Sequence, residues 1–285
     1  MLQTMIVTIV AIPLALGIAA AFGRRTLPSA AFALAIPLLA VAVYLGTEGI
    51  PGFPPTRAIH KFPYALAAGG VAFAIGALFL RRTGGILAGI LAAIAIGLPA
   101  WWLGSNILAN NSLKATVVVI LGVIAVAGSY FAASRAGAGK ALPDVIPQAV
   151  FATSLAAAIV AILGGYMGMA MFNGGLAALA GGYLLVTYLR HLRGDATAFA
   201  LDGAAGFAFA WVAFMGVVVT AILAPKASTA ALIAVGLTPA ATPFAGLYAG
   251  RLAGLPASLR PLALGAVSAI PALAGILIAG LQFAG

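Results

Sequence analysis

Residues 84–103 read GGILAGILAAIAIGLPAWWL, twenty consecutive residues without a charged side chain. A helix of this length rises about 30 Å, which matches the thickness of the hydrocarbon core of a lipid bilayer. The stretch does not alternate between apolar and polar residues, so a half-buried strand is not expected. It therefore predicts a helix that spans a membrane.

The rest of the chain has the same character. Of its 285 residues, 64% are hydrophobic and 6% are charged, and the mean hydropathy is +1.20. A soluble domain carries about 25% charged residues, so this chain cannot cover itself with a polar surface. In lipid, backbone polar groups must be satisfied internally. We expect an all-α polytopic integral membrane protein, solvated by the bilayer and without a soluble domain.

Ten apolar segments separated by polar or glycine-rich stretches predict about ten transmembrane helices. The first is taken as a span and not as a signal peptide, because its arginines follow the apolar run instead of preceding it. The turn between the sixth and seventh is expected near Asn173, since GGYMGMAMFNGG (164–175) is rich in turn-forming residues. The expected spans are 3–22, 28–46, 62–80, 84–103, 113–134, 146–168, 174–189, 204–223, 229–249 and 262–283.

The distribution of Lys and Arg predicts the orientation. Four of the 14 basic residues follow even-numbered spans: Arg57, Lys61, Lys114 and Lys226. The other ten follow odd-numbered spans, which the positive-inside rule places in the cytoplasm, with both termini outside. We expect a bacterial cytoplasmic (inner) membrane protein. The net charge of +10 is explained by this basic rim facing anionic lipid headgroups, so no nucleic-acid partner is expected.

One polar stretch, TEGIPGFPPTRAIHKFPY (47–64), joins the second and third expected spans on the outer face. Its prolines prevent a helix and favour an extended connector. The alternative is a lid or docking platform for an outer-face partner, built on Phe53, Pro54 and Pro55, with His60 as a pH-sensitive group. The aromatic residues Phe62 and Tyr64 are expected at the membrane interface.

Ionisable residues are scarce in the expected spans. The four acids are Glu48, Asp144, Asp195 and Asp202, and none falls deep in the bilayer. Asp202 is read as a helix N-terminal acid, or as a polar site in a cavity if its helix begins earlier. The chain has no cysteine, and its two histidines are expected on opposite faces. We therefore expect no enzyme, no cofactor and no metal site.

The ninth expected span contains two prolines near its middle. Thr238, Pro239, Thr242 and Pro243 lie in STAALIAVGLTPAATPFAGLYAGR (228–251), and two missing N–H donors predict a break or a strong kink. In a packed kink, the two threonine hydroxyls would bond freed carbonyls. In a binding site, the same groups would face a polar cavity.

A related phrase occurs in the fourth span. IAIGLPA (94–100) matches IAVGLTPA (233–240) at an offset of 139 residues, and the same offset maps the first five spans onto the last five. Because five is odd, halves 1–140 and 141–285 would be inverted repeats within a single membrane domain. This layout resembles the carriers of the sodium–proton antiporter, bile-acid-symporter and auxin-efflux-like type. That resemblance implies a binding site built by two broken helices, although the ion-binding acids of those carriers are not found here.

Two functions follow as alternatives. The first is a carrier of a small polar or anionic molecule, with half-helix N-termini at Pro99 and Pro239 and hydrogen bonds from Thr238, Thr242 and Asn106. The second is a non-enzymatic accessory subunit of a larger membrane complex. It would pack against a membrane-protein partner or a second copy through glycine pairs with small-xxx-small spacing, such as Gly85 and Gly89.

Overall fold

The computed structural model describes residues 6–79, 85–137, 145–195, 197–201, 203–252 and 254–284. Within these ranges all regular structure is helical, which confirms the all-α expectation. The elements are η1 (Val7–Ala11), α2 (Ile12–Thr26), α3 (Ser29–Glu48), α4 (Ala58–Phe79), α5 (Gly85–Asn110), α6 (Ser112–Gly137), α7 (Ile146–Leu163), α8 (Met167–Leu192), α9 (Gly203–Leu223), α10 (Thr229–Ala241), η3 (Thr242–Phe244), α11 (Gly246–Ala249), α12 (Arg260–Ser268) and α13 (Ile270–Ala284).

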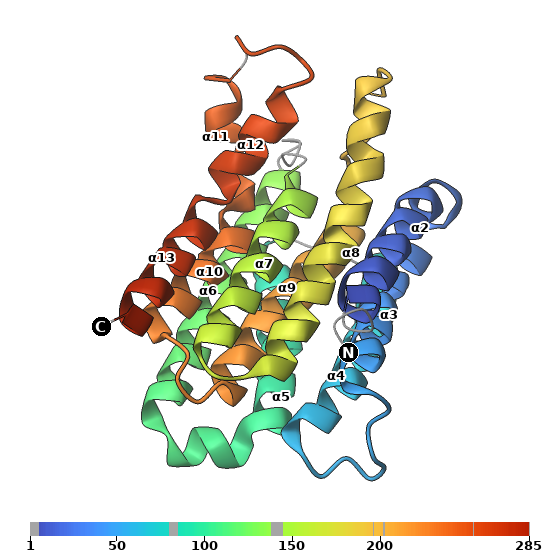
Figure 1. Cartoon of the computed structure of the whole chain (residues 1–285). Coiled ribbons are helices and arrows are strands. Elements are labelled where there is room, and N and C mark those ends of the chain that lie inside the picture. Colours follow the sequence, from blue (N-terminus) through green and yellow to red (C-terminus); the bar gives the residue numbers. More distant parts are fainter. Residues whose placement is uncertain are drawn as a thin grey trace.

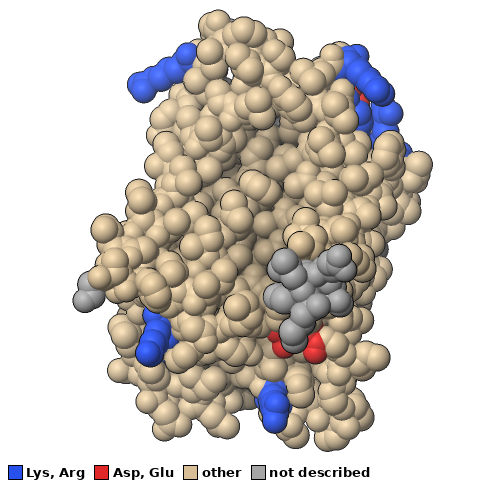
Figure 2. All heavy atoms as spheres, in the orientation of Figure 1, with Lys and Arg blue, Asp and Glu red and all other residues tan. Residues whose placement is uncertain are grey.

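The chain is a multi-pass membrane protein. Among the described residues, seven helices are long and apolar enough to cross a bilayer, and an eighth crossing results if α12 and α13, bent by 44°, count as one span. Of the other expected spans, α4 is not in this set and α10 has only 13 residues. Figure 2 shows the charged side chains of the visible face near its two ends, with an uncharged belt between them. This is the pattern that a surrounding bilayer requires.

The core of the bundle is α9. Sixteen of its 21 residues are buried, and it packs against α3, α7, α4 and α6 (Figure 1). Its sequence is apolar on every side, as expected for a helix with no exposed face. The expected halves interleave around it, because α2 packs along α8 and α3 packs on α9.

The turn between α7 and α8 is not at Asn173, as expected from the sequence. The chain turns at Gly164–Tyr166, where Gly165 adopts a φ of +76°, a conformation that glycine accepts without strain. Asn173 instead lies fully buried in α8 and donates Nδ2–H to the hydroxyl oxygen of Thr220, 3.0 Å away. The asparagine therefore joins two helices and forms no turn.

The helix breaks are also distributed differently from the expected pattern. Pro99 lies inside an uninterrupted α5, because a helix can lose one backbone hydrogen bond and remain continuous.

The packing of the helices does not show the expected inverted repeat. α7 and α8 pack along their length, whereas α2 and α3, which the repeat would equate with them, have few contacts.

Candidate functional site

The break in the expected ninth span lies at the C-terminal end of α10. The helix begins at a capped end, where the Ser228 side chain accepts the N–H of Ala231. It ends at Ala241 and continues as the 3-10 turn η3. Two closely spaced prolines cause this ending, because neither Pro239 nor Pro243 can donate a backbone hydrogen bond.

A threonine stabilises the break from within. The Thr242 hydroxyl donates to the carbonyl oxygen of Pro239, 2.8 Å away, which is the bonding expected for a packed kink. The Thr238 hydroxyl is buried and forms no hydrogen bond with any described group. Of the two threonines, only Thr242 therefore bonds a carbonyl at the break.

A cavity of about 200 Å³ lies beside the break. Pro239, Thr242 and Pro243 form part of its wall, and α5, α6 and α9 form most of the rest. The lining also includes Ile146, Leu201 and Gly203, which lie at the ends of α7 and α9. The cavity thus extends from the α10 break toward the end of the bundle that carries the α8–α9 connection.

Trp211 fixes one wall of this cavity. Its indole N–H donates to the carbonyl oxygen of Ala95 in α5, 3.0 Å away. On the other side the ring packs so closely on Gly69 of α4 that a Cβ there would overlap the indole. The tryptophan therefore holds α4, α5 and α9 at a fixed separation.

The lining of the cavity is nearly apolar. Among the described lining residues, Ser129 and Thr242 carry hydroxyl groups and none is charged. The helix N-terminus expected at Pro239, with its partial positive charge, does not lie at the cavity. Pro239 lies in the last turn of α10, so the helix presents its C-terminal carbonyls here, which carry partial negative charge. Burial of an ion in such a cavity would be costly.

The expected site residues are only partly brought together. Pro239, Thr242 and Pro243 share the cavity, whereas Thr238, Pro99 and Asn106 do not line it. Asn106 is exposed near the end of α5, where its carbonyl accepts the side-chain amide of Asn110 at 2.7 Å. Asp202 lies outside the described residues, between Leu201 and Gly203 in the sequence.

Sequence reasoning missed Trp211 and Ser129. A tryptophan deep in an apolar span was an available signal, because its N–H needs a partner when buried. Nothing in the sequence showed that the partner would be the Ala95 carbonyl, 116 residues away.

The outer-loop residues lie at the end of the bundle opposite the α8–α9 connection, toward which the cavity extends. Residues 49–57 connect α3 to α4, and Phe53 is 85% exposed there, next to exposed Pro54 and partly exposed Pro55. His60 is partly exposed in the first turn of α4. Phe62, expected at the interface, is instead in the core, with its ring 4.9 Å from that of Phe172.

A tyrosine at this end of the bundle has a perturbed pKa. Tyr166, in the α7–α8 turn, has a pKa raised by burial and, to a smaller degree, by the negative charge of Glu48. Within the described residues, no group of three or more His, Cys, Asp or Glu side chains could hold a metal ion.

Comparisons with known proteins give no family. No protein-family model, no curated protein and no solved structure matches the chain.

Proposed function

We propose that the chain is a membrane carrier, with ten crossings, for a small and largely apolar neutral molecule. The observation that carries this proposal is the cavity at the α10 break. A proline kink that served packing alone would be filled by neighbouring side chains, as protein interiors are. Here the two prolines and Thr242 border open space instead.

The size and lining of the cavity support this class of ligand. An engineered apolar cavity of about 150 Å³ in another protein binds benzene, so about 200 Å³ accommodates a molecule of about ten non-hydrogen atoms. Two hydroxyl groups can orient one or two polar atoms of the ligand. A polar or anionic substrate, expected from the sequence, would lack a charged partner in the described lining.

The accessory-subunit alternative has a separate observation in its favour. The hairpin of α5 and α6 buries a small part of its surface, and Ile86, Trp101 and Val123 are all more than 60% exposed. Lipid covers such a surface in a carrier, and another membrane protein covers it in a complex.

The carrier and accessory-subunit functions can be distinguished by the molecules that stay bound to the purified protein. The full chain is extracted in a mild detergent, and the bound small molecules are released with organic solvent and identified by mass spectrometry. The matched variants are Ser129→Leu, which fills the cavity, and Gly122→Leu, on the same helix where a side chain meets open space.

A carrier predicts a neutral small molecule that is enriched with wild type and Gly122→Leu and absent from folded Ser129→Leu. That molecule should equilibrate across proteoliposomes containing wild-type protein faster than across empty ones. Identical extracts from all three proteins, together with a stoichiometric protein partner, would replace the carrier with the subunit function.

A further inference from the structure

The C-terminal ends of α2 and α8 meet at one end of the bundle. The two helices run in parallel, with Gly175 of α8 against the backbone of Ile9 in η1, just before α2, and Gly182 against Leu14 further along. The second contact needs glycine, because a Cβ on Gly182 would overlap the Leu14 carbonyl. Arg25 in the last turn of α2 and Arg190 in the last turn of α8 therefore come together.

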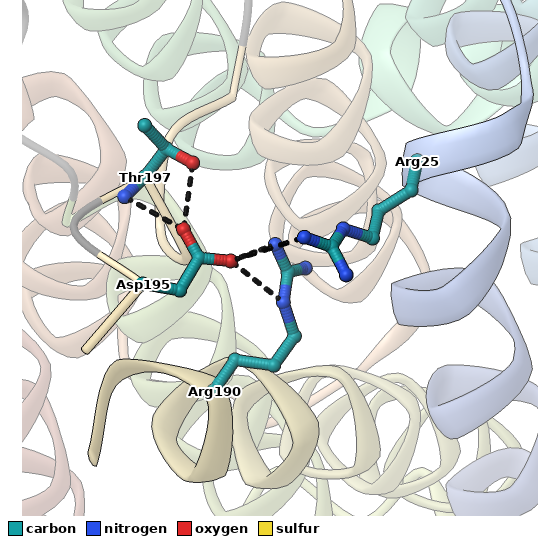
Figure 3. A network of polar contacts seen from close by, with 4 residues as sticks. All are labelled: Arg25, Arg190, Asp195 and Thr197. Atoms are coloured by element: carbon teal, nitrogen blue, oxygen red, sulfur yellow. Dashed lines mark hydrogen bonds and ion pairs between the residues drawn. The ribbon is translucent and has the colours of Figure 1, made fainter. Parts of the chain in front are cut away.

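A single carboxylate joins these two arginines (Figure 3). Asp195 Oδ2 accepts Nε–H and Nη2–H of Arg190, the Nε distance being 3.1 Å, and lies 3.6 Å from Arg25 Nη2. Its other oxygen accepts the backbone N–H and the hydroxyl of Thr197, at 3.0 and 2.8 Å. The hydrogen bonds from Arg190 and then Thr197 lower the pKa of Asp195 to about 2. The carboxylate is therefore ionised and has both oxygens bonded.

This carboxylate does not balance the local charge. Four arginines lie in or next to the last turns of the two helices: Arg24, Arg25, Arg190 and Arg193. Asp195 contributes one negative charge, and two helix C-termini contribute roughly −0.5 each. An excess of roughly two positive charges remains. Arg24 is turned inward over the ring of Phe32, 5.9 Å away, so the excess is presented mainly by Arg25, which is 64% exposed, and by exposed Arg193.

Apolar side chains lie directly next to these guanidinium groups along the helices. Leu185, Leu189 and Leu192 are exposed on α8, and their spacing of four and three residues places them on one face. Phe22, one turn before the α2 arginines, is also exposed. The surface therefore changes from apolar to strongly basic within about one helical turn, a change that suits the boundary between acyl chains and headgroups.

We propose that the paired ends of α2 and α8 bind an anionic phospholipid. Its phosphate contacts Arg25 and Arg193, and its acyl chains lie along Leu189, Leu192 and Phe22. A free phosphate would use only the basic half of this surface. A zwitterionic lipid would also bring a positive charge into a place that already has an excess of positive charge. The proposal is independent of the transported molecule, because the cavity lining contains none of these residues.

The test measures lipid retained by the purified full chain in detergent, using native mass spectrometry. The probe is dioleoyl phosphatidylglycerol, compared with dioleoyl phosphatidylcholine and with inorganic phosphate at the same concentration. The variant is Arg25→Gln combined with Arg193→Gln. The control is Arg251→Gln, an exposed arginine outside this cluster. Removal of one arginine at an anionic lipid surface is expected to weaken binding about fivefold.

Wild type and Arg251→Gln should retain phosphatidylglycerol in preference to phosphatidylcholine, and the double variant should bind it about 25-fold more weakly. Asp195→Asn should retain more phosphatidylglycerol than wild type, because it frees two guanidinium groups. If the double variant folds poorly, the single variant Arg193→Gln is used instead, because it disrupts no described side-chain bond. Equal retention by Arg193→Gln and Arg251→Gln overturns the proposal. Displacement of the lipid by equimolar inorganic phosphate also overturns it, since the site would then recognise a free anion.

Discussion

The Thr242 hydroxyl and the Pro239 carbonyl oxygen are 2.8 Å apart at the place where α10 ends. The carbonyl lies four residues before Pro243, whose missing N–H would otherwise bond it in a continuous helix. Thr242 thus replaces a donor that the sequence has removed. Four residues earlier, Thr238 in α10 also carries a hydroxyl, and this hydroxyl has no described partner.

These two threonines should respond differently to the same substitution. Thr242→Val removes a hydrogen bond and leaves the Pro239 carbonyl with one donor fewer, so unfolding should become easier by about 1 kcal/mol. Thr238→Val removes a buried hydroxyl that no described group satisfies, so stability should be unchanged or higher. The melting temperatures of the two purified variants measure this. A larger loss for Thr238→Val would mean that its hydroxyl has a partner in the membrane.

Restoring both backbone donors should remove the break. In the double variant Pro239→Ala, Pro243→Ala, α10 can continue as a regular helix, and the melting temperature should rise, with up to about 3 kcal/mol gained for a proline removed from a helix interior. Ligand retention should be lost, because the extended helix would change the shape of the cavity wall. A stable double variant that keeps its bound molecule and its transport would show that the break is not the binding site.

The sequence predicted the helical membrane class but not how the helices assemble. Composition and twenty-residue apolar runs are enough for an all-α membrane protein, because lipid leaves the backbone few alternatives. The connection between α7 and α8 was misplaced because glycine and asparagine have similar turn preferences. Only the fold shows that Asn173 has a buried partner in Thr220.

From the sequence, only the α10 side of the cavity was predictable. Proline chemistry is local, so the break near Pro239 follows from the sequence. Pro99 carries the same chemistry, yet α5 remains continuous. The opposite wall depends on contacts between distant helices, such as Trp211 with Ala95. Lys114 is a further example, since its ammonium group bonds the carbonyls of Ile222 and Ala224 at 2.7 and 3.2 Å.

The outer loop should tolerate replacement. Phe53 is mostly exposed and the loop lies away from the cavity, so a Gly/Ser stretch in place of 53–56 should change the unfolding free energy by about 1 kcal/mol or less. Phe62→Ala, in the nearby core, is the control that should cost about 3–5 kcal/mol. Thermal unfolding and copurification are both measured. Loss of a protein partner from a folded loop variant would show that the loop is a docking site.

The Asp195 network should contribute stability over most of the pH range and lose it in acid. Its pKa is lowered to about 2 from an ordinary value of 3.8, so the folded state favours the ionised form. The contribution is complete above about pH 4 and declines as the pH falls toward 2. Asp195→Asn should therefore melt below wild type from pH 5 to 8, and the difference should shrink below pH 4. A difference that is the same at pH 3 and pH 7 would contradict the ion pairs as its source.

The orientation of the chain should follow its arginines. The loop between α3 and α4 lies at the lower end of the bundle in Figure 1, and the segment between α11 and α12 lies at the upper end. The sequence assigns ten of the 14 basic residues to the loops that follow odd-numbered spans, and the positive-inside rule places those loops in the cytoplasm. Cysteines can be placed at Gly52 and Gly254, where an added Cβ meets nothing closer than 3.9 Å, and the chain has no cysteine of its own to react. An impermeant maleimide should label Gly52→Cys in intact cells and Gly254→Cys only after lysis. The reverse pattern would place the basic end outside, against the potential that normally retains it.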